Sequence, residues 1–108
     1  MAQFTHAETY KEAAAQYPLS EWLAQLAEEA TELAQAALKY RRTLEPAALW
    51  TPKTSDEMLH NLIEEFADVK SCMEKVVDNM DLVNETIEVS KAKESRFVQR
   101  HNEHKVQD

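Results

Sequence analysis

Two acidic motifs of the same form are the residues of this sequence best suited to chemistry. They read Glu28-Glu29-Ala30-Thr31-Glu32 and Glu64-Glu65-Phe66-Ala67-Asp68. On a helix, side chains three positions apart share a face and have Cβ atoms roughly 5–6 Å apart, so the second and fifth residues of each motif can bind one cation. Carboxylate oxygens are the ligands that magnesium prefers, and manganese accepts the same ligand type. We therefore predict a magnesium site, in which manganese can substitute, formed by Glu29, Glu32, Glu65 and Asp68.

These four carboxylates would repel one another in the absence of a cation. Two unit charges 4 Å apart in a partly screened site cost about 4 kcal/mol. We therefore expect crowding to raise the pKa values of the carboxylates in the metal-free protein. Neither motif contains a histidine or a cysteine, which argues against zinc as the bound ion.

Helices must position the two motifs, because the chain contains no glycine among its 108 residues. Sheets joined by tight turns usually need glycine, whereas helix interiors disfavour it. The predicted fold class is all-α, an antiparallel helical bundle completed by oligomerisation, in a single domain covering residues 1–108. In chain order we expect an N-terminal arm or short helix within 1–17 and then a helix from 19 or 20 to 42. A linker at 43–53 leads to a second helix from 54 or 55 to 80 or 81. A third helix follows at 83–104, and its end frays over 101–108.

The apolar residues of the two long helices predict which sides they bury. At about 100° per residue each helix carries one wide apolar stripe. The first stripe consists of Leu19, Trp22, Leu23, Leu26, Ala30, Leu33, Ala34 and Ala37, and the second of Met58, Leu59, Leu62, Ile63, Phe66, Val69, Met73, Val76, Val77 and Met80. Glu29 falls roughly 80° from its stripe centre, and Glu65 has the same offset on its own helix. Two antiparallel helices packed on these stripes would bring the carboxylates together at one flank of the seam. The alternative, for either motif alone, is a solvated acidic face.

Composition limits the partners of this chain. It has 20 acidic against 12 basic residues and a net charge of −8, which makes it a poor binder of polymeric nucleic acid. One cysteine, Cys72, excludes an internal disulfide and suits a reducing compartment, and no apolar run approaches the length of a membrane span. We expect a cytoplasmic protein with no membrane partner. Three helices of this size bury a thin core, so we also expect a homodimer or homotetramer.

The last helical segment adds a cluster of positive charge. Lys93, Arg96 and Arg100 are spaced i, i+3 and i+7, so they share one helix face. Arginine matches phosphate oxygens with two parallel hydrogen bonds and lysine adds a point charge, which suits a polyphosphate. The alternative is a solvated helix face. We interpret Cys72 as a core or near-core residue, and the remaining candidates, His60, His101 and His104, as surface residues.

These motifs resemble a known family. Glu28-Glu29-x-x-Glu32 followed by Glu65-x-x-Asp68 resembles the motif of MazG-like all-α nucleoside triphosphate pyrophosphohydrolases, a superfamily that also includes dimeric dUTPases and phosphoribosyl-ATP pyrophosphohydrolase. The stretch Asn61-Leu-Ile-Glu64-Glu65-Phe-Ala-Asp68-Val69 is similar to the second helix of the small, phage-type members, and Lys93-x-x-Arg96-x-x-x-Arg100 resembles a basic element near their end. The resemblance covers residues 19–100. The sequence departs from the family in a longer gap between the acidic motifs, around Trp50, and in Trp22, where a polar residue is usual.

The resemblance implies hydrolysis of a nucleoside triphosphate between its α- and β-phosphates, which yields a nucleoside monophosphate and pyrophosphate. Glu29, Glu32, Glu65 and Asp68 would be the catalytic residues that hold magnesium, and either a carboxylate or the metal would activate the attacking water. The residues implied in substrate binding are Asn61 for sugar or base, and Lys39, Lys93, Arg96 and Arg100 for phosphates. For Trp22 and Trp50, packing in the core or a lid is the alternative to stacking on a base.

Two other functions fit the same residues. A non-catalytic helical interaction module would use the acidic cluster to bind a basic partner. A nucleotide sensor would keep the nucleotide site and turn over little.

Overall fold

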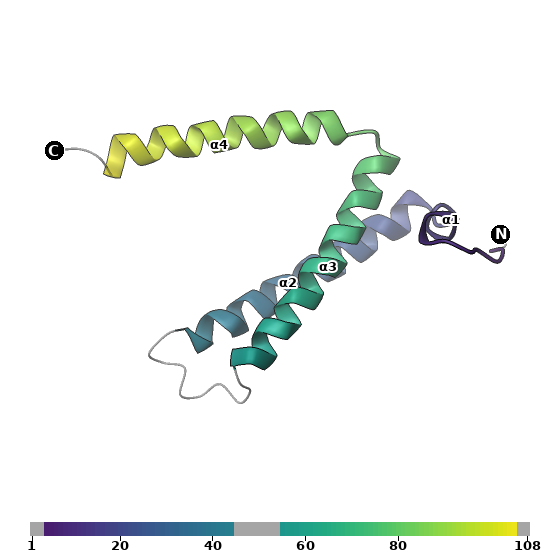
Figure 1. The fold of residues 1–108 in the computed structure, drawn as a ribbon. Coiled ribbons are helices and arrows are strands. Elements are labelled where there is room, and N and C mark those ends of the chain that lie inside the picture. The colour runs from purple at the N-terminus through teal and green to yellow at the C-terminus, as the bar shows by residue number, and fades with distance from the viewer. Residues whose placement is uncertain (1–3, 45–54, 106–108) are drawn as a thin grey trace. The chain divides into compact units, whose positions relative to one another are not determined.

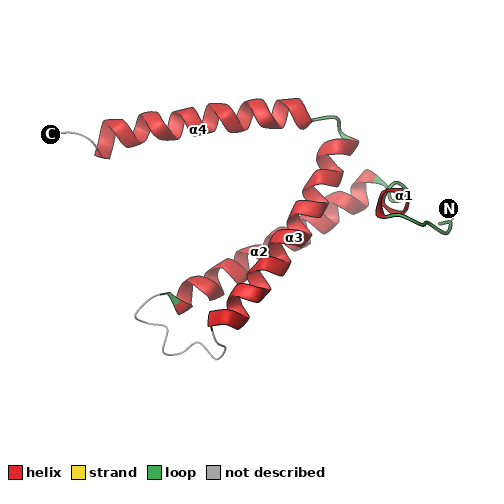
Figure 2. Ribbon diagram, viewed as in Figure 1, coloured by secondary structure: helices red, strands yellow, loops and turns green. Residues whose placement is uncertain are grey.

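The computed structural model describes residues 4–44 and 55–105, and over these ranges it is all-helical, with no strand (Figure 1; Figure 2). This confirms the predicted all-α class. The helices are α1 (Tyr10–Ala14), α2 (Leu19–Thr43), α3 (Ser55–Asn79) and α4 (Val83–Lys105). The predicted linker with its two prolines and Trp50 lies largely outside the described residues. No helix within the described ranges is long and apolar enough to cross a membrane.

Local sequence sets the ends of the first two helices. The hydroxyl of Thr9 caps α1 by accepting a hydrogen bond from the backbone N–H of Glu12 at 3.1 Å. Pro18 is the N-cap of α2 and has an extended backbone, and its carbonyl accepts a hydrogen bond from the N–H of Glu21 at 3.0 Å. The helix begins at Leu19, one of the two starts that the sequence predicted, although Ser20 is by residue type the better N-cap. The fixed φ of proline already ends the preceding turn, so the helix begins two residues earlier than a cap at Ser20 would allow.

The turn after α3 shows how a chain without glycine ends a helix. Asp81 has a φ of 54°, in the left-handed region that glycine usually occupies. The N–H of Leu82 donates to the carbonyl of Val77 at 2.9 Å, and the N–H of Asp81 donates to the carbonyl of Asp78 at 3.1 Å. These are the two hydrogen bonds of a Schellman motif, with aspartate as one of the few other residues that tolerate this conformation.

The chain forms two compact units that divide within α3. The first unit ends at Val76 and contains α1, α2 and most of α3. The second begins at Val77 and contains the last residues of α3 and all of α4. The carboxylates of both acidic motifs belong to the first unit, whereas the basic face of Lys93, Arg96 and Arg100 belongs to the second.

Within the first unit, α2 and α3 lie antiparallel and side by side (Figure 1). The hydroxyl oxygens of Thr43, at the end of α2, and Ser55, at the start of α3, are 3.2 Å apart. Most of the buried and half-buried positions follow each helix at alternating spacings of three and four residues, as in coiled coils, whereas Asn61, Lys75 and Val77 are half-buried outside this repeat. We call them the seam rows. They are Trp22, Leu26, Glu29, Leu33, Ala36 and Tyr40 on α2, and Met58, Leu62, Glu65, Val69, Cys72 and Val76 on α3.

The seam rows correct the predicted stripes. Each predicted stripe combined two neighbouring rows, but only one row of each helix is covered in this hairpin, because a single partner helix covers a narrow strip. The other row is exposed, and we call the two together the outer apolar face. It consists of Leu23, Ala27, Ala30, Ala34 and Ala37 on α2, and Leu59, Ile63, Phe66 and Met73 on α3. Because the helices are rotated by one row, Glu29 and Glu65 lie in the seam itself rather than at its flank.

The N-terminal segment packs on the first unit through aromatic side chains. The indole N–H of Trp22 donates to the carbonyl of Ala14 at 3.2 Å. The ring of Tyr17 stacks on Phe4 at 4.8 Å and meets Trp22 edge-on at 6.2 Å between centroids. Lys75 places its ammonium 4.8 Å from the ring centroid of Tyr10. The predicted arm or short helix is therefore a five-residue helix docked on α2 and α3.

We expect the seam rows to carry the stability of the hairpin. Leu62→Ala, at a side chain with 8% exposure, should lower the free energy of unfolding by about 2–5 kcal/mol through lost burial and a cavity. Leu38→Ala makes the same change at a side chain that is 52% exposed and should cost less than about 0.5 kcal/mol. Urea unfolding of both variants measures the difference, and equal losses would contradict the assignment of the seam.

Candidate functional site

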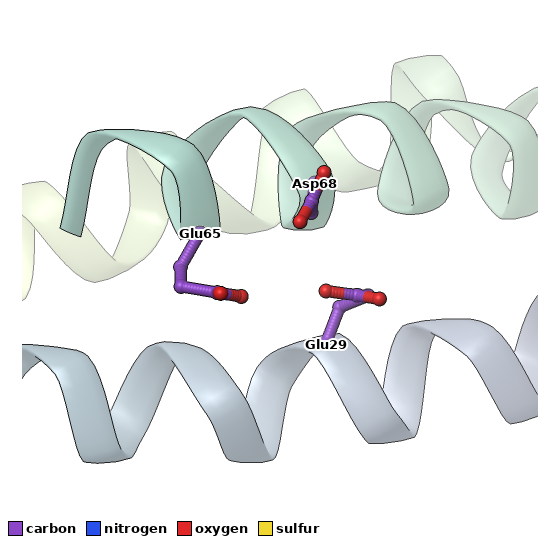
Figure 3. Close-up of side chains that lie close together, drawn as sticks. All are labelled: Glu29, Glu65 and Asp68. Carbon is purple, nitrogen blue, oxygen red and sulfur yellow. The ribbon is translucent and has the colours of Figure 1, made fainter. Parts of the chain in front are cut away.

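Three of the four predicted carboxylates converge at the seam, with Glu29 and Glu65 in its rows and Asp68 at its edge. Glu29 of α2 points toward Glu65 and Asp68 of α3, as Figure 3 shows. One carboxylate oxygen from each residue lies within 4.8 Å of the others. Glu29 and Glu65 are half-buried and Asp68 is exposed, so the cluster has a shielded side and an open side. This spacing lets one cation contact all three residues.

Two oxygens of this cluster are buried without a hydrogen-bond partner. They are Oε2 of Glu29 and Oε2 of Glu65, and no described residue supplies a donor to either. An ionised carboxylate oxygen that is cut off from water and from donors is unfavourable, so the site needs a proton or a cation there. The donor set therefore fits a hard divalent cation held by oxygens.

The pKa of Glu29 reflects the same unfavourable environment. Burial is the main cause that raises its pKa from the ordinary 4.5 to about 7, followed by the charges of Glu32 and Asp68, then an interaction of its carboxyl group with that of Glu32 and the charge of Glu65. The expected effect of crowding is thus present, but desolvation is the larger cause because Glu29 occupies a seam position between apolar neighbours.

The pKa of Glu65 is raised for the same main reasons. Burial comes first, and the charges of Glu32 and Asp68 follow, while an interaction of its carboxyl group with that of Glu29 acts in the opposite direction. Glu32 acts on both half-buried glutamates, so it adjoins the cluster, but it is exposed and lies outside the three residues whose oxygens meet within 4.8 Å. The structure places the fourth predicted ligand beside the other three.

Two pockets open on either side of the cluster. The larger one, about 530 Å³, includes Glu29 and Asp68 in its wall. The smaller one, about 160 Å³, includes Glu32 and Glu65. The two glutamates of α2, three residues apart, therefore line different pockets, and the carboxylate cluster forms the boundary between them.

The predicted substrate-binding residues of the first unit both line the smaller pocket. Asn61 on α3 and Lys39 on α2 face it together with Gln35. Lys39 is the only cationic side chain among the described residues that line either of the two pockets. A phosphate group is therefore better matched to the smaller pocket than to the larger one.

Lys93, Arg96 and Arg100 line one shallow hollow of about 260 Å³ on α4, together with Phe97. They share one face, as their spacing predicts. Since they belong to the second unit, their part in the site of the first unit stays a prediction.

The structure adds several residues that the sequence patterns did not indicate, and it places Trp22, one of the two candidates for stacking on a base, beside them. The wall of the larger pocket is completed by Tyr10, Tyr17, Glu21, Trp22, Gln25, Ser71 and Cys72. Gln25 lies one turn before Glu29 and Ser71 one turn after Asp68, so the face of the acidic motifs, extended by a turn in each direction, could have indicated both. The tyrosines come from the N-terminal segment, whose docking no periodicity predicts.

Two further predictions about single residues are confirmed. Cys72 is buried, and burial, followed by the charges of Glu29 and Asp68, raises the pKa of its thiol. His60 is exposed and pairs with Glu64 at 2.9 Å, which accounts for Glu64 outside the cluster.

Comparison of the chain with known protein families, with curated proteins and with solved structures finds no match.

The pKa of Glu29 predicts a pH-dependent stability in metal-free protein. A carboxyl group whose pKa is about 7 in the folded chain and about 4.5 when unfolded holds its proton more tightly when folded, so the free energy of unfolding falls as pH rises between these values. Glu29→Gln removes this cost, and its stabilising effect should be small at pH 5 and largest at pH 8. Urea unfolding in the presence of a chelator measures this.

The matched control is Glu28→Gln, at the neighbouring exposed residue. It changes the net charge equally and should give no gain that grows with pH. A gain from Glu29→Gln that is the same at pH 5 and pH 8 would contradict the buried position of this carboxylate.

Proposed function

We propose that this protein is a magnesium-dependent hydrolase that cleaves a nucleoside triphosphate between its α- and β-phosphates and releases pyrophosphate. The observation that carries the proposal is the convergence of Glu29, Glu65 and Asp68 from two helices, with two buried oxygens that lack a partner. The resemblance of the two acidic motifs to MazG-like pyrophosphohydrolases supports the choice of reaction, and manganese is expected to replace magnesium.

The residues that would hold the cation are Glu29, Glu65 and Asp68, with Glu32 beside them. All of them offer oxygen, and the neighbouring thiol of Cys72 has a raised pKa that keeps it protonated and a poor ligand, which favours magnesium over a softer ion. When bound, the cation neutralises charge on the triphosphate and polarises its phosphate oxygens. An acidic protein of net charge −8 needs such an ion before it can approach an anionic substrate.

The other residues around the cluster bind substrate and accept a proton. Lys39 provides a cation to phosphate oxygens at the smaller pocket, and Asn61, which the family resemblance implies for sugar or base, offers an amide at the same pocket. Glu32 lies at the same pocket and is exposed, so it can accept the proton of the attacking water. Lys93, Arg96 and Arg100 are proposed to bind the outgoing phosphates, from the same chain or from a second copy.

We further propose that a second copy covers the outer apolar face to complete an antiparallel helical bundle, as a homodimer or homotetramer. Phe66 and Ile63 are 52% and 54% exposed, which is unusual for a continuous apolar row in a lone soluble chain. The row on α2 is mostly alanine and the row on α3 carries large side chains. In a two-fold contact the large residues of one copy can pack over the alanines of the other, so the face is complementary to itself.

Hydrolysis is tested by Glu65→Gln, compared with Glu64→Gln at the neighbouring exposed position. We expect Glu65→Gln to reduce pyrophosphate release by at least about 100-fold, since it removes a charge at the reacting centre, and Glu64→Gln to retain it. Release is measured over the canonical nucleoside triphosphates with millimolar magnesium. Full activity of Glu65→Gln would refute the assignment.

Thermal melting of the same proteins separates metal binding from turnover. Magnesium at about 100 times its Kd should stabilise the natural chain and Glu64→Gln by about 2.7 kcal/mol, and Glu65→Gln much less. Nucleotide binding without pyrophosphate release would indicate a sensor instead of an enzyme. A chain that responds to neither magnesium nor nucleotide would indicate an interaction module.

Self-association is tested by Phe66→Glu in the outer apolar face. Ala67→Glu introduces the same charge at the next residue, which is exposed and outside both rows. We expect the natural chain and Ala67→Glu to sediment as dimers or tetramers and Phe66→Glu as a monomer, because a buried charge opposes packing. A natural chain that is monomeric, or a Phe66→Glu variant that associates normally, would refute the proposed contact.

A further inference from the structure

The larger pocket beside the carboxylate cluster is unlike the smaller one in both size and lining. Its volume of about 530 Å³ lies within the range of about 300–1,000 Å³ typical of small-molecule sites, whereas the smaller pocket, about 160 Å³, is too small for a nucleoside. Three aromatic rings line it, from Tyr10, Tyr17 and Trp22. Size and lining together fit a flat heterocycle.

The aromatic side chains of this pocket are held by contacts with one another and with residues outside it. The indole N–H of Trp22 is bound to the carbonyl of Ala14, and Tyr17 is fixed between Trp22 and Phe4. Lys75 lies against the ring of Tyr10. Because these rings already have their partners, a ligand can contact them without first ordering them.

The polar side chains of the pocket are free to bind a ligand. Glu21 and Gln25 lie one turn apart on α2, and Ser71 lies opposite on α3. None of these three side chains has a hydrogen-bond partner among the described residues. Glu21 offers only acceptors when ionised, whereas the amide of Gln25 and the hydroxyl of Ser71 can each donate or accept.

Charge decides the orientation of a nucleotide across the cluster. Glu21, Glu29 and Asp68 line the larger pocket and no described basic residue does, so it repels phosphate but tolerates a neutral base. The smaller pocket holds Lys39. A nucleotide with its base in the larger pocket thus directs its phosphates past the carboxylates toward Lys39.

From these observations we infer that the larger pocket is the base site of the nucleotide and that Glu21 selects bases that carry an exocyclic amino group. The inference rests on the proposed nucleotide hydrolysis. Adenine, cytosine and guanine present amino hydrogens to a carboxylate, whereas uracil and thymine have no exocyclic amino group, and their one ring donor, N3–H, lies between two carbonyl oxygens that a carboxylate repels. A hydrogen bond to a charged group contributes about 1.5–3 kcal/mol, which corresponds to a preference of about 10-fold or more.

The test uses Trp22 as a reporter within the pocket. The sequence contains two tryptophans, so Trp50→Phe leaves Trp22 as the single indole. Quenching of its fluorescence by nucleoside monophosphates gives Kd values with millimolar magnesium present. We expect saturable quenching, with uridine and thymidine monophosphates binding at least about 10-fold more weakly than those with amino-bearing bases.

Glu21→Gln, made in the same background, should reduce this preference to less than about threefold, because an amide can donate to a carbonyl oxygen. Glu28→Gln removes the same charge from an exposed position of α2 that does not line the pocket, and should keep the preference. The absence of saturable quenching up to about 10 mM nucleotide, or an unchanged preference in Glu21→Gln, overturns the inference.

Pyrophosphate release by the same proteins tests the proposed hydrolysis separately from the proposed base site. Base-selective quenching without release would retain the base site and reject the enzyme. Release combined with quenching that does not depend on the base would retain the enzyme and reject the role of Glu21.

Discussion

Two glutamates that face each other inside an apolar seam are the constraint on which the rest of this structure depends. The seam rows of α2 and α3 contain no lysine or arginine that could neutralise Glu29 and Glu65. Desolvation and like charge both disfavour their ionised forms, and the raised pKa values of the two residues record this. An apolar pair at these positions would pack better and give a firmer hairpin. Their presence is therefore difficult to explain by folding alone.

The same pair of residues divides the hairpin into two chemically different sides. On one side of the seam lie Glu32, Asp68 and the two pockets. On the other lies the outer apolar face, with alanines on α2 and large side chains on α3. Rotation of either helix by one row would expose the buried residues of the seam, such as Leu62. The rotation that buries the apolar row is thus also the one that points the acidic motifs at each other.

The sequence was sufficient to predict the helical class, the approximate ends of the long helices and the meeting of the acidic motifs. These predictions rest on the lack of glycine, the positions of the prolines and the repeated spacing of glutamates. Such features act through neighbouring residues and do not depend on how the helices pack. The rotation of the helices was not predictable in the same way, because Leu23 and Leu26, or Leu59 and Leu62, are equally apolar and only the number of packing partners decides which row is covered. The larger pocket was also beyond the sequence patterns, since Tyr10 and Tyr17 reach it through the docking of a segment that has no periodicity of its own.

The larger pocket is complete only when that N-terminal segment is docked. Part of its wall is formed by residues of α2 and α3 and part by Tyr10 and Tyr17, which line it while the N-terminal segment is docked on Trp22 and Lys75. Ligand binding in the pocket and docking of this segment are therefore coupled. Docking raises the affinity for the ligand, and the bound ligand stabilises the docked segment by the same free energy. In such an arrangement, the affinity for a ligand depends in part on whether the N-terminal segment is ordered.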